Sequence, residues 1–242
     1  MKPLIVLLLG LFCTPTFART KDNETWVRSH NPGWHMLASA SGSLVGGQDD
    51  VVVVLEMPAT GAGTPSRTLK VYAGQVAGDP LLKCEAKKAV SRDSDISSDT
   101  FSLKILKGVL IIWSGGGRGN MQSHTELKWR WNHGDMVLIG VNADEGNLGA
   151  QKGEAMEIKR DINLVTLEMT ERKRMVVKPS TSDNVDEGTY KNTSSHCRVS
   201  QDYQAIVLSR FDADGFDRRL DSLHCDGHFS QGLSPQHLPH SR

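Results

Sequence analysis

The chain has 242 residues, and its 28 basic residues balance its 28 acidic residues, so its formal net charge at pH 7 is zero. A neutral chain lacks the basic surface that general nucleic-acid binding requires, and we expect no nucleic-acid partner. After the first eighteen residues no apolar stretch approaches the length of a membrane-spanning helix, so we also expect no stable membrane insertion.

Residues 1–18 have the pattern of a cleaved export signal. Lys2 supplies a positive start, residues 4–12 are almost entirely apolar, and Thr16, Phe17 and Ala18 give the small-x-small ending that signal peptidase reads. The apolar run is shorter than the roughly 20 residues that a stable transmembrane helix needs. We therefore expect a periplasmic or secreted protein.

Residues 19–178 have the pattern of one β-rich domain. Residues 51–55 are apolar without interruption, which is typical of a strand buried on both faces. A turn near Lys107 and Gly108 predicts a hairpin that joins strands at 100–105 and 109–113. Further strands are predicted at residues 68–72, 125–131, 136–140, 154–162 and 174–178. Because helical periodicity is not sustained, the predicted fold is all-β, with antiparallel sheets in a blade-like or sandwich-like arrangement.

The chain changes character after this domain. Residues 179–195 are polar, with almost no apolar side chains, and predict a linker. Residues 196–229 contain a strand-like run at 203–208 and predict a small C-terminal β appendage. Residues 230–242 are polar and contain two prolines, so we expect a disordered tail.

Three cysteines remain once the signal is removed. Cys197 and Cys225 lie in the same C-terminal segment, and an oxidising compartment favours a disulfide between them. Cys84 lies in an apolar run, and it is either a buried free thiol or one half of an intermolecular bridge. Zinc is the alternative for the C-terminal pair, because His228 follows Cys225 at a usable spacing.

Three groups of short motifs are similar to those of exported bacterial proteins related to FG-GAP or VCBS-type repeats. The resemblance covers approximately residues 33–167 and implies a β-rich, blade-like or sandwich-like domain outside the cytoplasm, with no single activity. In those repeats an acidic, glycine-containing loop precedes an apolar strand. Here Ser43, Val45 and Gly47 stand near the positions of the ligands, which leaves too few carboxylates for calcium at this loop. The motifs are residues 40–56; residues 106–112 with 114–116 and 129–131; and residues 135–140 with 161–164.

Tryptophans suggest one candidate ligand-binding site. Trp129 and Trp131 share one face of a predicted strand, and Trp113 lies in the preceding hairpin. Such rings either form a platform that stacks on sugars or on a partner protein, with Lys128 or Arg130 at its rim, or they belong to the core.

Alternating aspartates suggest a candidate cation site. Asp212, Asp214 and Asp217 surround Gly215, and such a pattern can bring several carboxylate oxygens onto a calcium ion. Arg210 and Arg218 oppose a cation there, and the alternative is an Asx-type turn between two strands. We expect no other cofactor.

The sequence lacks the usual enzymatic motifs, such as Gly-x-Ser-x-Gly and His-Glu-x-x-His. The leading hypothesis is an exported, non-enzymatic β-domain protein that binds a protein or a cell-envelope glycan. One alternative is an inhibitor or immunity protein that acts on a toxin or a lysozyme-like enzyme. Another is a hydrolase of envelope material that uses two carboxylates, such as those in residues 212–217, because separation in space cannot be read from a sequence.

Overall fold

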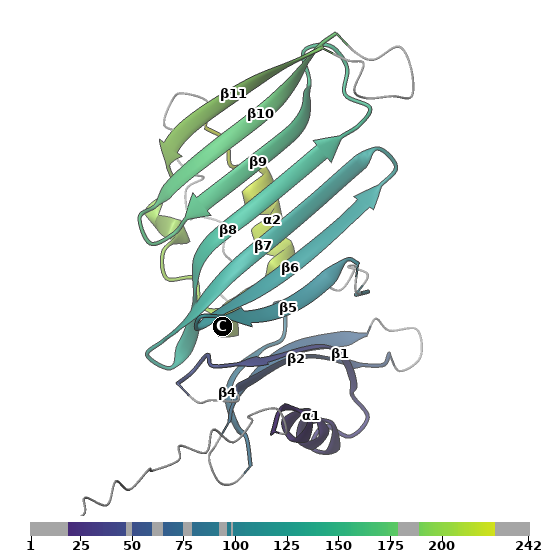
Figure 1. The fold of residues 1–242 in the computed structure, drawn as a ribbon, viewed down its shortest axis with the longest axis vertical. Helices are drawn as coiled ribbons and strands as arrows, with labels where there is room; N and C mark the ends of the chain where they lie inside the picture. The colour runs from purple at the N-terminus through teal and green to yellow at the C-terminus, as the bar shows by residue number, and fades with distance from the viewer. Residues whose placement is uncertain are drawn as a thin grey trace, which may run out of the picture.

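The computed structural model describes residues 19–46, 50–59, 65–74, 79–91, 96–97, 99–178 and 189–225. In this part of the chain eleven β-strands form two antiparallel sheets, of four and seven strands. Figure 1 shows the larger sheet above the smaller one, with helix α1 (Arg19–Ser29) beneath the small sheet and helix α2 (Ala213–Asp221) behind the large sheet. The predicted antiparallel, mostly β architecture is confirmed.

The small sheet has the strand order β1-β2-β3-β4 and is covered by α1 on one side. Residues 51–55 of β2 are buried on both faces, as predicted. Val51, Val53 and Leu55 face Val27 of α1, whereas Val52 and Val54 face the main core. The strands are β1 (His35–Gly42), β2 (Asp50–Met57), β3 (Ser66–Ala73) and β4 (Leu81–Ala86).

The large sheet is a simple antiparallel meander in the order β11-β10-β9-β8-β7-β6-β5. Two of its turns contain consecutive residues of positive φ, Lys107 with Gly108 and His133 with Gly134, which is the geometry of two-residue hairpins. The turn at Lys107 and Gly108 lies where the sequence predicts it. The strands are β5 (Phe101–Leu106), β6 (Val109–Arg118), β7 (Met121–Asn132), β8 (Asp135–Asn147), β9 (Ala155–Asn163), β10 (Glu168–Lys178) and β11 (Thr189–Arg198).

The two faces of the large sheet have different roles. One face, here called the inner face, carries Leu110, Trp129 and Met169 and packs against Phe216 and Leu220 of α2. The same apolar cluster includes residues of the small sheet, so both sheets share one core. The opposite face, here called the outer face, is turned to the viewer in Figure 1 and carries polar side chains and Trp113.

The C-terminal region differs from the expectation of a linker and a β appendage. Residues 189–195, expected in a linker, belong to β11, which pairs with β10 along its whole length. Residues 203–208 form no strand; Val207 makes a single bridge to Val137 of β8, between two short 3-10 helices, Gln201–Tyr203 and Leu208–Arg210. The appendage is therefore helical, and its apolar side chains lie in the shared core.

Several expectations concern segments outside the described residues. The export signal (residues 1–18), the first part of the predicted linker (179–188) and the tail (230–242) all fall there. Within the described ranges, no helix is both long enough and apolar enough to cross a bilayer.

Candidate ligand-binding face

The register of the large sheet brings an aromatic pair to its outer face. Trp113 of β6 pairs with Glu126 of β7, and the next residue pair on the same face is Gly115 with His124. The indole of Trp113 and the imidazole of His124 are stacked, with ring centroids 5.5 Å apart and planes inclined by 22°. Trp113 is half-buried and His124 is exposed, so the two rings offer an aromatic surface to solvent.

Gly115 makes room for this ring pair. A Cβ atom at position 115 would lie 2.6 Å from Cδ2 of His124 and 2.8 Å from Cη2 of Trp113. Both distances are shorter than normal Cβ contacts, so a side chain at position 115 would force one or both rings to shift. A Cβ atom built on the neighbouring Gly116 would have no atom within 4 Å, so a side chain fits there.

Polar side chains from β7 and β8 flank the rings. Trp113 and His124 line a shallow hollow of about 330 Å³ together with Glu126, Asn142 and Asp144. Asn142 donates a hydrogen bond from Nδ2 to Oε1 of Glu126 at 3.1 Å, which holds both groups at the hollow. Oδ1 of Asn142 is shielded from solvent and has no hydrogen-bond partner among the residues described. An aromatic ring beside carboxylate and amide oxygens is a chemically suitable surface for a polyhydroxylated ring.

Ion pairs neutralise part of this face. Lys128 contacts Glu126 at 3.3 Å, and Lys159 contacts Asp144 at 3.6 Å and Glu157 at 2.6 Å. The hydrogen bond to Glu157, together with the nearby carboxylates, raises the pKa of Lys159 above its usual value. Lys159 therefore stays charged in its position beside the hollow.

The structure separates the three tryptophans that the sequence grouped into one platform. Trp129 is fully buried on the inner face, where its ring meets Phe211 edge-on, and Trp131 is half-buried against the same core. Arg130 lies on the outer face, but it pairs with Val109 at the far end of β6 from the rings. Of the two alternatives, the core therefore applies to Trp129 and in part to Trp131, because odd-numbered residues of β7 face inward.

The three candidate metal ligands lie at helix α2 rather than in a loop between strands. Asp212 is the N-cap, and its Oδ1 accepts a hydrogen bond from the backbone N–H of Gly215 at 3.2 Å. Asp214 is in the first turn, where the helix dipole favours an acidic residue. Across the described ranges, no three His, Cys, Asp or Glu side chains are arranged to hold a metal ion. The acidic motif thus begins a helix, and the expected Asx turn between two strands is wrong.

The other acidic motif, before β2, also has a structural role. The carboxylate of Asp50 is fully buried and accepts hydrogen bonds from the backbone N–H groups of Leu44, Val45 and Gly74, at 2.6–3.0 Å. These bonds hold the backbone at residues 44–45 and at Gly74 to the first residue of β2. They also use the carboxylate oxygens that a cation would need.

A polar cleft of about 510 Å³ lies on the other side of the large sheet, beside α2. Glu145 of β8 lines it together with Asp217 and Asp221 of α2. Desolvation, assisted by the charges of Asp221 and Asp214, raises the pKa of Asp217 to about 6. Glu145 pairs with the guanidinium of Arg160, which keeps its carboxylate beside a permanent positive charge.

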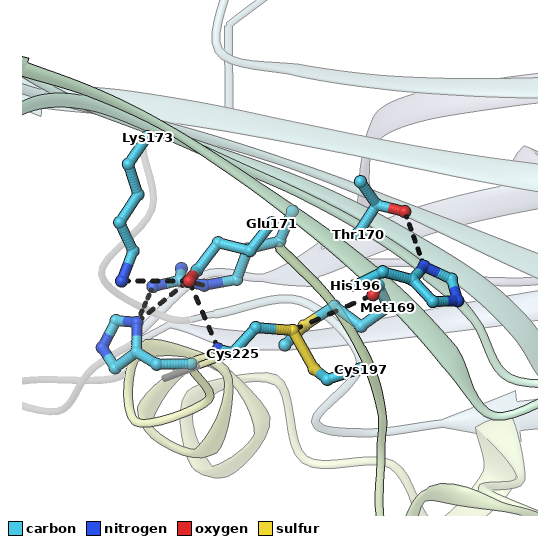
Figure 2. Close-up of a disulfide and its surroundings, with 9 residues drawn as sticks. Met169, Thr170, Glu171, Lys173, His196, Cys197 and Cys225 are labelled. Atoms are coloured by element: carbon cyan, nitrogen blue, oxygen red, sulfur yellow. Dashed lines mark hydrogen bonds and ion pairs between the residues drawn. A yellow bond between two sulfur atoms is a disulfide. The ribbon is translucent and has the colours of Figure 1, made fainter. Parts of the chain in front are cut away.

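An ion-pair network adjoins this cleft and lies beside the predicted disulfide (Figure 2). The Cys197–Cys225 bond is present, so these two thiols are unavailable to zinc. Next to the disulfide, the buried carboxylate of Glu171 accepts hydrogen bonds from Nε of Arg160 at 3.2 Å and from the backbone N–H of Cys225 at 3.2 Å. The network and the disulfide together fasten the end of the C-terminal segment to β10 and β11.

Cys84 is a buried free thiol, one of the two predicted alternatives. Its Sγ donates to Oδ1 of Asp135 at 3.2 Å, and burial together with this carboxylate raises its pKa to about 12. Asp135 also accepts a hydrogen bond from Ser209, so the contact joins the small sheet, the large sheet and the C-terminal segment. A thiol with so high a pKa is a poor nucleophile.

The geometry therefore gives two candidate sites, an aromatic hollow on the outer face and an acidic cleft on the inner face. Comparison with known proteins adds no family to this picture, because no family model, curated protein or solved structure matches the chain.

Proposed function

We propose that the protein is an exported, non-enzymatic binding protein that holds a cell-envelope glycan on the outer face of its large sheet. The observation that carries this proposal is the Trp113–His124 pair, which lies exposed to solvent beside Glu126, Asn142 and Asp144. A sugar ring can stack on the aromatic surface while its hydroxyls hydrogen-bond the neighbouring carboxylate and amide groups.

Two features support export. The pattern of residues 1–18 is that of a signal peptide, and disulfides such as Cys197–Cys225 persist mainly in oxidising compartments. Glycans of the cell envelope are then among the ligands that the protein meets.

The experiment uses the ring pair and its glycine. The full chain and three variants, Trp113→Ala, Gly115→Ala and Gly116→Ala, are titrated with a panel of envelope oligosaccharides by isothermal titration calorimetry. We expect Trp113→Ala to abolish binding and Gly115→Ala to weaken it about tenfold or more, because a Cβ at 115 displaces both rings. Gly116→Ala is the matched control, since open space surrounds that position, and it should bind like the wild type. Wild-type affinity in Trp113→Ala, with the fold intact, would refute the proposal.

A specific observation favours a second candidate function, a carboxylate-based hydrolase of envelope material. Asp217, with its pKa raised to about 6, and Glu145, held beside Arg160, line one cleft. A carboxyl group of raised pKa beside a second carboxylate is the kind of pair that glycoside hydrolysis uses. Turnover of peptidoglycan or polysaccharide that disappears in Asp217→Asn would establish this function, and absence of turnover by the wild type on such substrates would exclude it.

A further inference from the structure

The hollow at the aromatic pair continues across the outer face. A second hollow, of about 250 Å³, shares Asn142 and Asp144 with the first and extends to Asp161 of β9 and to Thr170 and Arg172 of β10. Because the two hollows share two walls, they form one groove, here called the outer groove. It crosses five strands, from β6 to β10.

Strand register explains why the groove is continuous. Side chains that pair across neighbouring strands stand in rows at right angles to the strands. With strands about 4.8 Å apart, the four steps from β6 to β10 span about 19 Å, which accommodates several linked pyranose rings. One row contains Trp113, Glu126, Asn142, Asp161 and Thr170, and the adjacent row contains Gly115, His124, Asp144, Lys159 and Arg172.

The two ends of the groove differ in chemistry. The β6–β7 end is aromatic, whereas the β10 end carries the exposed guanidinium of Arg172. Lys159, the other cation of these two rows, is already engaged by Asp144 and Glu157. Within the described part of the chain, no ion pair engages Arg172, and its planar guanidinium can bind a carboxylate, sulfate or phosphate group through two hydrogen bonds.

We propose, building on the glycan-binding function above, that the ligand is a linear acidic oligosaccharide laid across strands β6 to β10. One ring stacks on Trp113 and His124, hydroxyls meet Glu126, Asn142 and Asp161, and an anionic substituent pairs with Arg172. The shared chemistry of that substituent is an anionic oxygen group, and its source is a uronate, a sulfate ester or a phosphate ester.

Asp161 makes the charge argument testable in both directions. Asp161 and Arg172 stand in adjacent rows, and the carboxylate of Asp161 also lines the groove. It therefore opposes an anionic substituent while it can accept hydroxyl groups. Asp161→Asn should strengthen binding of an acidic ligand and Arg172→Gln should weaken it, a pair of opposite effects that a merely structural role would not give.

The experiment measures the affinity of the full chain for a galacturonate tetrasaccharide and for its fully methyl-esterified form. A sulfated and a phosphorylated tetrasaccharide are tested in parallel. We expect the wild type to bind at least one anionic probe about tenfold more tightly than the neutral ester, the effect of one charge-assisted hydrogen bond. The anionic probe that binds best identifies the source of the charge.

Variants show whether Arg172 is responsible. Arg172→Gln should reduce the preference to within about twofold. Arg172→Lys should keep part of the preference, because it retains the charge but loses the planar pair of donors. Arg130→Gln is the matched control, since Arg130 is exposed on the same face but outside both hollows, and it should change nothing.

The possible failures are distinguishable. Equal affinity for acidic and neutral probes, or a preference that survives Arg172→Gln, would overturn the acidic-ligand inference and leave the glycan-binding function standing. Absence of binding to all four probes and to the wider glycan panel would overturn both.

Discussion

Glu171 offers the most informative test of how this fold is held together. Its side chain is 1% exposed and that of Arg160 is not exposed at all, yet both are charged. Besides Arg160 and Cys225, the carboxylate accepts from Nζ of Lys173 at 3.0 Å, and its Oε2 lies 3.0 Å from Nδ1 of His224. Glu171→Gln keeps the shape of the side chain and removes its charge, so Arg160 loses its buried counter-ion.

The expected cost follows from the partners that remain. Removing one partner of a buried ion pair typically costs about 3–5 kcal/mol. Arg160 keeps its contact with Glu145, so we expect the lower end, about 3 kcal/mol. For a domain of this size that corresponds to a fall in melting temperature of roughly 6–12 °C.

The pH dependence gives an independent check. Burial by itself raises the pKa of Glu171, but the hydrogen bonds from His224, Lys173 and Cys225 outweigh it, and the pKa lies below its usual value of 4.5. A lowered pKa in the folded state means that the carboxylate stabilises the fold fully above pH 4.5 and loses this effect as the pH falls through the folded-state pKa. The stability difference between wild type and Glu171→Gln should therefore be full at pH 7 and shrink below pH 4.5.

The assay is urea unfolding at pH 7 and at pH 4. Glu168→Gln is the control, because Glu168 lies exposed on the same strand, and its effect should stay within about 0.5 kcal/mol. The double variant Arg160→Met with Glu171→Leu should recover much of the lost stability, since apolar residues of similar size can replace a buried pair. A cost below about 1 kcal/mol for Glu171→Gln at pH 7, or a difference that does not change with pH, would refute this account.

Four further outcomes are expected. Replacing Cys197 and Cys225 with Ser should lower the free energy of unfolding by about 3.5 kcal/mol, the chain-entropy value for a separation of 28 residues, and an unchanged urea midpoint would contradict this. Trp129→Ala should cost about 3–5 kcal/mol in the same assay, because the ring is fully buried, whereas a cost near zero would place the ring outside the core. Asp217→Asn should raise the melting temperature at pH 7.5 and not at pH 4, because the raised pKa makes the ionised form unfavourable in the folded state; a decrease at pH 7.5 would show that the charge stabilises the fold. Cys84, with a pKa of about 12, should resist Ellman's reagent at pH 8 until the protein is unfolded, as followed by mass spectrometry, and rapid labelling of the native protein would disprove its burial.

The strands and hairpins were predictable because their signals are local. The apolar run at 51–55, the alternation around Trp129 and the turn at Lys107 and Gly108 each lie within a few residues of sequence. Two-residue turns also fix the pairing of the strands that they join, so the β5–β6 hairpin follows from the sequence.

The C-terminal half was harder to predict because its structure depends on partners. Strand β11 consists largely of polar residues and forms by pairing with β10. Helix α2 has only nine residues, too few for a sustained period, although Asp212 as N-cap and the spacing of Phe216 and Leu220 give a weak helical signal. The apolar side chains of this helix pack against the large sheet, whose strands lie far away in the sequence.

Only part of the candidate site could be predicted from the sequence. Trp113 was identified, but its grouping with Trp129 assumed that both rings face the same side. The pairing of Trp113 with Glu126 places it opposite the even-numbered residues of β7, and this register depends on the two-residue turn at Gly119 and Asn120. His124, which completes the aromatic surface, was missed for the same reason.

The two faces of the large sheet differ in role, and this difference is the strongest reason to look for function on the outer face. The inner face packs the core and carries the ion pairs that secure the C-terminal segment, so its large side chains have structural explanations. The ring of Trp113 stands apart from that core, half-exposed and stacked on an exposed His124. Gly115 weakens the strand beneath it, since glycine inside a strand costs about 0.5–1 kcal/mol relative to alanine. A sheet that only had to fold would gain stability from a side chain at position 115. That side chain would dismantle the aromatic pair, so Gly115→Ala should weaken ligand binding far more than Gly116→Ala does.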